Sequence, residues 1–404
     1  MRIALLGADE DTLRLAAAAI ADGHTLSAAA ESGAFAAEVR RLAPLLEPNA
    51  PWENLLAGSP AEVVLVGVTL PGRAKDDPRS AEDIRSEQLR RLAQEELPLV
   101  LIPPGCDLDT GYELEAIRRD RNGFVAAWID DWNHPAWDRV EALLTADATG
   151  PLGGVEKLTW ERYLPDRSRA AVRKQFVADL AVLRRLFGPI RTIYAGGAHG
   201  ETHYDPFAPK RGAPELDQVT IQVGVDRPCV VRWSAEPVVE GEAGRVTLVG
   251  KRASWELIQS ADEDWAEEVA GIRTPIPLGG GSLWTTLAAQ LRGERPCGAL
   301  PLWFDTCRDL ESLEAIDRSL ARGRTVALHA EETDEAEAFK SVMASGGCLI
   351  LSLIPVLLVA GIALDQLGLT FIRRWWVPGL IALIVVFLLL QSLRLFTRPK
   401  PQAG

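Results

Sequence analysis

The sequence predicts a chain of the α/β class in three parts: a domain built on a parallel sheet, an α+β domain with an open antiparallel sheet, and two transmembrane helices. Three observations lead to this prediction. Apolar strands alternate with amphipathic helices up to about residue 145, strand-like runs with short turns then follow one long helix, and two uncharged apolar runs end the chain. The expected boundaries are 1–148 and 149–330 for the two domains, 331–346 for a linker and 347–396 for a helical hairpin.

The first domain begins with an apolar strand over Arg2–Leu6, which stops at Gly7 and opens into an alanine-rich helix over Thr12–Ala21. This order of strand, glycine turn and helix is typical of the first unit of a Rossmann-like, dinucleotide-binding domain. Because the later strands are continuously apolar and separated by helices, we expect a parallel sheet that is covered on both faces. The further elements are expected at Thr25–Ala30, Glu38–Leu46, Val63–Val68, Ala81–Glu96, Leu99–Ile102, Phe124–Ile129 and Ala136–Leu144, and the last two close this domain.

The second domain combines one long helix, expected over Arg169–Phe187, with several strands in sequence. Consecutive strands with short polar turns indicate an antiparallel sheet, here with one face covered by the long helix. The strands are expected at Arg191–Ala195, Val219–Val225, Cys229–Ser234, Arg245–Gly250, Ser254–Ile258 and Thr325–Leu328, and two further helices at Leu283–Leu291 and Leu310–Ala321.

The charge and the cysteine content restrict the class of protein. The 404 residues carry a formal net charge of −13, with a sequence pI near 5.0. Because phosphate binding is built from clustered Lys and Arg, we expect no nucleic-acid partner. The five cysteines have no metal-ligand spacing and a chain of this length needs no disulfide bonds, so a reducing compartment fits best.

Two uncharged apolar runs at the end of the chain predict membrane attachment. Cys348–Leu364 has 17 residues and Trp375–Leu393 has 19, and a helix needs about 17–25 apolar residues to cross a bilayer. The alternative, a pair of buried core helices, is disfavoured because neither run carries a polar stripe. If both runs cross, the positive-inside rule favours a cytoplasmic body, since the basic residues on its side are Lys340, Arg394, Arg398 and Lys400 against Arg373 and Arg374 in the connecting loop.

The order of features resembles the Gfo/Idh/MocA family of NAD(P)-dependent sugar and polyol oxidoreductases. The resemblance covers about residues 2–328 and is carried by pattern more than by motif, in the segments Leu97–Leu101, Gly150–Val155, Asp179–Gly188 and Leu313–Leu328. It implies a Rossmann domain, a second domain whose open sheet often pairs into homo-oligomers, NAD(P) as cofactor and a sugar-like ligand between the domains. It does not account for the two apolar runs.

The resemblance implies cofactor contacts at Gly7, Ala8, Asp9, Glu31 and Pro104. The family's Gly-x-Gly-x-x-Gly turn falls here on Gly7, Asp9 and Thr12, so only the first glycine is present. Carboxylates at a helix N-terminus oppose a phosphate, and we expect Asp9 or Asp11 to cap the helix instead. Glu31 follows the second strand, where the family holds an acidic residue on the ribose.

The resemblance also implies catalytic positions, and two of them have changed. The family's Glu-Lys-Pro falls on Ile102, Pro103 and Pro104, and proline transfers no proton. A cis bond before Pro103 or Pro104 is possible at this turn. The family's His-x-x-Asp falls on Phe176 and Asp179, so the catalytic candidates are Asp179 and, as a substitute for the histidine, Lys174.

The remaining candidates favour structure over chemistry. His199 and His203, with Glu201 and Asp205, could hold a metal, but a polar surface loop is the preferred interpretation and no metal site is assigned. The sequence therefore predicts a membrane-anchored, oxidoreductase-like protein that is catalytically degenerate and keeps a cleft for a sugar-like ligand, a nucleotide or a protein partner. The alternative is an active NAD(P)-dependent sugar or polyol oxidoreductase with a rearranged cofactor turn.

Overall fold

The structure is a computed structural model, and the residues before Ala330 form one compact unit, Met1–His329. Both apolar runs and the expected linker lie outside the described residues. Within the described part of the chain, no helix combines the length and the apolar character that a membrane crossing requires. The described ranges are 1–56, 61–70, 79–146, 149–199, 202–203, 218–261, 264–269, 272–277, 283–294 and 299–328.

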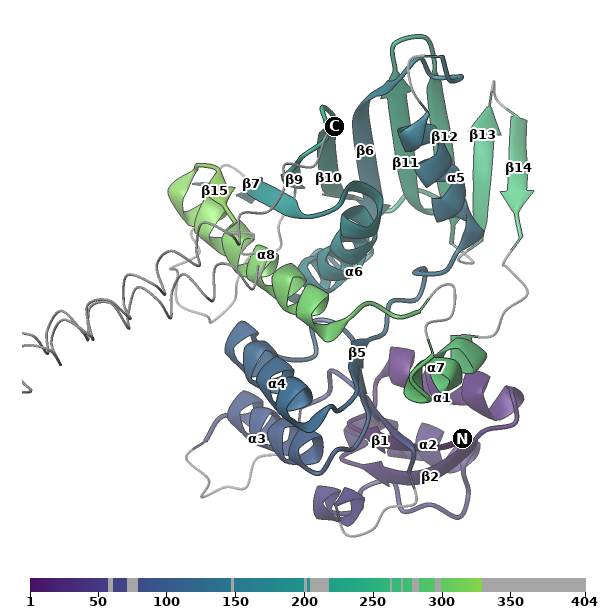
Figure 1. Ribbon diagram of the computed structural model, residues 1–404, viewed down its shortest axis with the longest axis vertical. Coiled ribbons are helices and arrows are strands. Elements are labelled where there is room, and N and C mark those ends of the chain that lie inside the picture. Colours follow the sequence, from purple (N-terminus) through teal and green to yellow (C-terminus); the bar gives the residue numbers. More distant parts are fainter. Residues whose placement is uncertain are drawn as a thin grey trace, which may run out of the picture. The chain divides into compact units, whose positions relative to one another are not determined.

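A five-stranded parallel sheet forms the first domain, in the order β2-β1-β3-β4-β5, which confirms the Rossmann-like prediction (Figure 1). Parallel pairing brings the carboxyl ends of all five strands to one edge, where ligands of such sheets bind. The strands are β1 (Arg2–Leu6), β2 (Thr25–Ala30), β3 (Val63–Val66), β4 (Leu99–Leu101) and β5 (Val125–Ala127).

Helices cover both faces of this sheet. Buried residues of α1 and α2 join one apolar cluster with one face, and those of α3 and α4 join a second cluster with the other. Helix α4 was not expected from the sequence, because its buried face mixes Thr110, Gly111 and Glu115 with Leu114 and shows no apolar stripe. The helices are α1 (Glu10–Ala21), α2 (Ala36–Leu42), α3 (Ala81–Gln94) and α4 (Leu108–Arg121), with 3₁₀ turns η1 (Gly33–Phe35) and η2 (Trp52–Leu55).

The second sheet has ten strands among the described residues, in the order β14-β13-β12-β11-β6-β10-β9-β7-β15 with β8 paired to β7. The long helix α6 (Arg169–Phe187) lies on it with the bounds expected from the sequence. The strands are β6 (Val155–Tyr163), β7 (Ile190–His199), β8 (Thr202–His203), β9 (Gln218–Val225), β10 (Val230–Glu236), β11 (Glu242–Gly250), β12 (Ser254–Ser260), β13 (Trp265–Val269), β14 (Ile272–Ile276) and β15 (Val326–Ala327).

The expectation of an open antiparallel sheet was wrong in one respect: the sheet is mixed, because β10 pairs in parallel with β6. Helix α6 connects the end of β6 to the start of β7, so that β6 and β7 run in the same direction. Strand β9 is antiparallel to both β7 and β10, and β10 therefore runs parallel to β6. The sequence did not reveal β6, since two charged residues stand on each side of its segment Leu158–Trp160.

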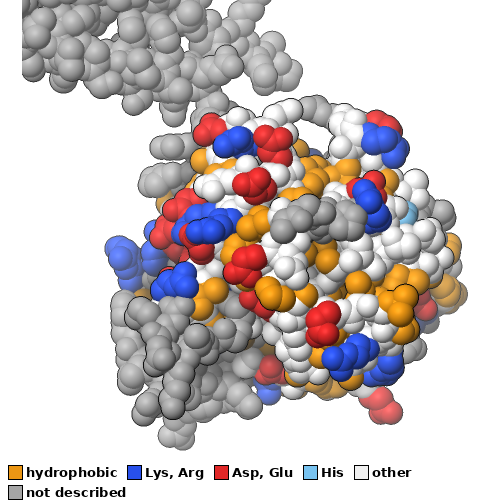
Figure 2. Space-filling view, turned by 90° about the horizontal axis from the view of Figure 1, so that it is seen from below, with side chains coloured by type: hydrophobic (Ala, Val, Ile, Leu, Met, Phe, Trp, Pro, Cys, Tyr) orange, Lys and Arg blue, Asp and Glu red, His pale blue; other side chains and the backbone are white. Residues whose placement is uncertain are grey.

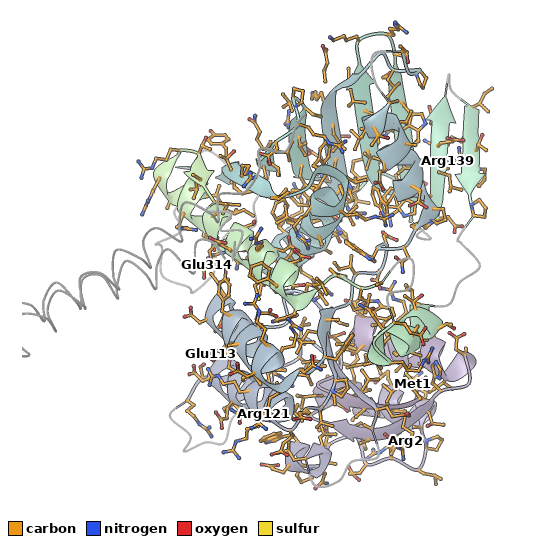
Figure 3. All side chains as sticks on the ribbon, viewed as in Figure 1. Met1, Arg2, Glu113, Arg121, Arg139 and Glu314 are labelled. Atoms are coloured by element: carbon orange, nitrogen blue, oxygen red, sulfur yellow. The ribbon has the colours of Figure 1, made fainter. Side chains whose placement is uncertain are left out.

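Helix α5 (Pro135–Thr145) does not close the first domain as expected, but packs on the second sheet. Trp137 lies between Trp160 of β6 and Trp265 of β13, with ring centroids 4.9 and 5.0 Å apart. Arg139 on the same helix forms an ion pair of 3.0 Å with Glu267 of β13 (Figure 3). Helix α5 follows β5 closely in sequence, yet it packs on the second sheet, because this position buries the Trp137 side chain against two aromatic rings.

Two later helices contact the first domain. Helix α7 (Leu283–Leu291) returns to the first sheet, where the rings of Trp284 and Trp128 are 5.5 Å apart. Helix α8 (Trp303–Arg322) begins earlier than expected and spans both cores: Trp303 packs on the first sheet and Leu313 on the second. On the face shown in Figure 2, Lys and Arg side chains are interspersed with Asp and Glu.

We expect Trp137→Ala to lower the free energy of unfolding by about 3–5 kcal/mol, because it removes a fully buried aromatic side chain from a packed core. Glu141→Ala, at an exposed position of the same helix, should stay within about 0.5 kcal/mol of the wild type. Urea unfolding followed by tryptophan fluorescence measures both. Similar stabilities for the two variants would contradict the packing of α5 on the second sheet.

Candidate functional site

The first turn, at the carboxyl end of β1, is covered by the loop that follows β3. Gly7, Ala8 and Asp9 are all buried. Gly7 has φ +75°, and a Cβ there would lie 2.7 Å from the carbonyl oxygen of Thr69. The Thr69 hydroxyl donates in turn to the carbonyl oxygen of Ala8. The protein's own backbone therefore occupies the space directly above the turn.

Asp9 uses the hydrogen-bond donors of this turn. Its Oδ1 accepts from the backbone N–H of Thr12 at 2.8 Å, and its own N–H donates to Thr12 Oγ1 at 2.8 Å. Its Oδ2 accepts from the backbone N–H of Val68 at 2.6 Å. The prediction that an acidic residue caps helix α1 is confirmed, with Asp9 as the cap. A carboxylate thus stands where a helix N-terminus would otherwise hold a phosphate.

A buried arginine of α3 lies beside the residues that follow β1, β2 and β3. Arg85 of α3 is 2% exposed and donates from Nη2 to the carbonyl oxygen of Thr69 at 2.6 Å. The same nitrogen lies 3.3 Å from Oε2 of Glu31, whose Oε1 accepts from Gln88 Nε2 at 2.6 Å. Burial lowers the pKa of Arg85 to about 10, although the charge of Glu31 opposes this shift.

These contacts do not fit a dinucleotide at the turn. The N–H of Thr12 at the N-terminus of α1 and that of Val68 in the loop after β3 are bonded to Asp9, and the acidic residue expected on the ribose is bonded to Arg85 and Gln88. The sequence pointed to Asp9 and Glu31 but not to Arg85 or Gln88. Nothing in the composition of α3 marks those two residues, because only the strand order brings α3 beside Glu31.

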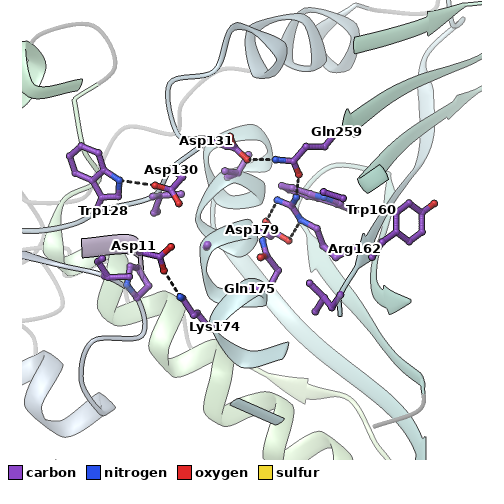
Figure 4. Close-up of a pocket in the computed structure, with 18 of the residues that line it drawn as sticks. Asp11, Trp128, Asp130, Asp131, Trp160, Arg162, Lys174, Gln175, Asp179 and Gln259 are labelled. Atoms are coloured by element: carbon purple, nitrogen blue, oxygen red, sulfur yellow. Dashed lines mark hydrogen bonds and ion pairs between the residues drawn. The ribbon is translucent and has the colours of Figure 1, made fainter. Parts of the chain in front are cut away.

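A cavity of about 330 Å³ lies between the two sheets and collects most of the other candidates (Figure 4). Asp179 and Lys174, the predicted catalytic residues, both line it. At the carboxyl end of β4, Ile102 and Pro103 line it, and the Pro103–Pro104 peptide bond is cis. The charged residues of its wall are Asp11, Arg14, Asp130, Asp131, Arg162, Lys174 and Asp179.

Phe176, at the position that the resemblance assigns to a histidine, lies in the core. Its side chain is fully buried, and its ring makes an edge contact with Trp233 at 5.1 Å between centroids. The preceding residue on α6, Gln175, lines the cavity instead. No proton-transferring side chain therefore replaces the histidine at that position.

Asp179 serves mainly to hold a buried arginine. It accepts from Arg162 Nε at 2.8 Å and from Arg162 Nη2, from the Trp233 indole at 2.8 Å and from Gln175 Nε2 at 3.1 Å. Burial acts against the charge of Arg162, but the charge and hydrogen bonds of Asp179, with the charge of Asp131, together raise its pKa above the ordinary value. Both carboxylate oxygens of Asp179 are thus committed within the protein.

Lys174 is bound to the first domain. Its ammonium forms an ion pair with Asp11, the second residue of α1, and Arg14 lies 3.3 Å from the same carboxylate. Arg14 also pairs with Asp130, which follows β5 and accepts from the Trp128 indole at 3.0 Å. These pairs link α6, α1 and the loop after β5 along one wall of the cavity.

Asp131 is the group in the cavity best suited to exchange a proton. Its Oδ2 accepts from Gln259 Nε2 at 3.0 Å, and Gln259 Oε1 accepts from Arg162. Burial raises the pKa of Asp131 to about 6, against the effects of Arg162 and of the Trp265 indole. Sequence reasoning missed Asp131, although its place after a parallel strand was a usable signal.

Asp131→Asn should stabilise the chain at pH 7 but not at pH 4. The pKa in the folded chain, about 6, exceeds the unfolded value of about 3.9, so the native state binds more protons between these values and stability falls as pH rises through them. Asp131→Asn should remove this decrease, so that its free energy of unfolding at pH 7 exceeds that of the wild type by roughly 1–3 kcal/mol.

Thermal unfolding of the full chain at the two pH values, followed by tryptophan fluorescence, measures the difference. Asp120→Asn, at an exposed position of α4, is the control and should change neither value. An equal gain for Asp131→Asn at both pH values would contradict the raised pKa.

The residues considered for a metal site are only partly described. His199 ends β7 and His203 lies on β8, which pair in an antiparallel register, while Glu201 and Asp205 lie outside the described residues. Among the residues that the structure describes, no group of three or more His, Cys, Asp or Glu is arranged to hold a metal ion.

Comparison with known proteins finds solved structures with a similar fold. No protein-family model and no curated protein matches the sequence. Solved structures do match: the aldose-aldose oxidoreductase of Caulobacter crescentus, complexed with glycerol, has a TM-score of 0.60 at 15% identity over 81% of this chain and 99% of that one. UDP-N-acetylglucosamine 3-dehydrogenase of Acidithiobacillus ferrooxidans has a TM-score of 0.57 at 16% identity, over 80% and 98%.

A third structure, the biliverdin reductase of Synechocystis in complex with biliverdin and NADP⁺, has a TM-score of 0.54 at 15% identity over 80% of this chain and 98% of that one. At such identities the likeness shows the fold. The chain therefore has the Gfo/Idh/MocA-like oxidoreductase fold over about four fifths of its length, as the resemblance implied.

Proposed function

We propose that this chain is a membrane-anchored protein that has lost the dinucleotide chemistry of its fold and uses the cavity between its sheets to bind a sugar-like ligand. The observation that carries the proposal is the capped turn: the Asp9 carboxylate takes the N–H groups of Thr12 and Val68. Any diphosphate would have to displace this buried carboxylate, and would then approach its negative charge.

The catalytic positions support the same conclusion. Pro103 stands where the resemblance implies a lysine, and Phe176 is turned into the core where it implies a histidine. Loss of one general acid or base typically costs about 10²–10⁴-fold in rate. Two such losses, together with an engaged Asp179, leave little of the dehydrogenase chemistry.

The cavity suits a small polar ligand. At about 330 Å³ it is at the lower end of ligand-pocket volumes, enough for one sugar ring but not for a dinucleotide. Its wall combines apolar groups of Ile102, Ile129 and Trp128 with polar groups of Gln175, Asp131 and Tyr163. Sugar rings offer apolar C–H faces and a rim of hydroxyls, and this wall is complementary to both.

The alternative function is an active NAD(P)-dependent sugar or polyol oxidoreductase with a rearranged turn. One observation favours it: Asp131 has a pKa near 6 and faces the cavity, so that it could accept a proton from a substrate hydroxyl near neutral pH. In that case a nucleotide would bind away from the contacts of Asp9.

Titration of the full-length protein in detergent with NADH and NADPH, followed by nucleotide fluorescence, separates the two functions. We expect no saturable binding up to about 1 mM, because the turn is closed by its own side chains. Micromolar binding would contradict the proposal. Two variants would then show whether the turn is the binding site. Asp9→Ala removes the cap and should change the affinity if the nucleotide binds there, whereas the control Glu10→Ala removes only an exposed charge beside the cap.

Membrane anchoring rests on the two apolar runs, 348–364 and 375–393, with the body on the cytoplasmic side by the distribution of basic residues. We expect the expressed chain to stay in the membrane pellet after washes with high salt and with alkaline carbonate, and to be released by detergent. Release by salt alone would contradict two spanning helices.

A further inference from the structure

The cations that line the cavity between the sheets are each paired with a carboxylate. Arg162 is held by Asp179, and the other two cations are paired with carboxylates of the first domain. The cavity has four carboxylates and three cations among its described lining residues. The ion pairs are Arg162 with Asp179, Lys174 with Asp11, and Arg14 with Asp130 and Asp11.

Asp131 is the carboxylate left over from this pairing. In the described part of the chain, no Lys or Arg side chain lies within ion-pair distance of it, and its hydrogen bond comes from the neutral amide of Gln259 at 3.0 Å. The orientation of that amide is determined, because Gln259 Oε1 accepts from Arg162 and its Nε2 must then point to Asp131 (Figure 4).

We infer that Asp131 forms a subsite for a positively charged group, so that the preferred ligand is a polyhydroxylated ring carrying an amino group. This inference rests on the proposed ligand-binding cavity. A protonated amine would supply the countercharge that Asp131 lacks, in the form of a charge-assisted hydrogen bond. A phosphorylated or carboxylated ligand would instead meet the unpaired carboxylate and be repelled.

The preference should depend on pH. The charged groups that face Asp131 are Arg162 from β6, Asp179 from α6 and Asp130 from its own loop. Burial and the two carboxylates raise the pKa of Asp131 to about 6, so the subsite is charged at pH 7 and mostly neutral at pH 5. The preference for an amine should therefore fall roughly tenfold between these pH values.

Isothermal titration calorimetry of the full chain in detergent, with glucosamine, glucose and glucose 6-phosphate as probes, tests the inference. At pH 7 we expect glucosamine to bind roughly tenfold or more tightly than glucose, as for a hydrogen bond between charged groups, and glucose 6-phosphate to bind more weakly than glucose. Asp131→Asn should bring the affinity for glucosamine down to that for glucose, and the control Asp120→Asn should keep the preference.

The outcomes separate this inference from the proposed function. Equal binding of glucosamine and glucose by the wild type would overturn the cationic subsite and leave the sugar-binding cavity standing. A preference that survives in Asp131→Asn or that does not change at pH 5 would overturn the role of Asp131. Failure of all three probes to bind up to about 10 mM would overturn both.

Discussion

The buried ion pair between Arg162 and Asp179 is the centre of a hydrogen-bond network that extends from the second sheet to the first domain. It joins β6 to α6, and its hydrogen bonds extend to Trp233 on β10 and to Gln259 on β12. Gln259 continues the network to Asp131, which follows the last strand of the first sheet. Removing one partner of such a pair typically costs about 3–5 kcal/mol, because the other is left buried with an uncompensated charge.

This network also explains the character of the cavity. Arg162 donates three hydrogen bonds to Asp179 and Gln259, so these two residues hold it in the wall of the cavity. A second set of pairs, through Asp11 and Lys174, links α1 to α6. The described wall of the cavity is therefore rich in paired charges, and Asp131 is its one carboxylate outside these ion pairs.

At the first turn, too, side chains of the protein make contacts of the kind that a bound ligand could make. In a dinucleotide-binding domain the helix N-terminus holds a phosphate. Here Asp9 supplies the negative oxygens, and Arg85 is bonded to the neighbouring loop at Thr69. The local energetics favour this arrangement, because the same N–H donors are satisfied without a cofactor. The same fold can thus carry different contacts at its first turn, and fold similarity alone does not decide activity.

The sequence by itself determined the parallel sheet, helix α6 with both its bounds, and the capping of α1 by an acidic residue, either Asp9 or Asp11, because these follow from local periodicity and from hydrogen bonds within a few residues. Only the tertiary structure decided that α5 packs on the second sheet, that Phe176 faces the core, and that Asp131, Gln259 and Arg162 form one network. The physical reason is that these contacts join residues up to 128 positions apart. Which of these residues are buried and which pair with each other depends on the order of the strands, and no local sequence pattern reveals that order.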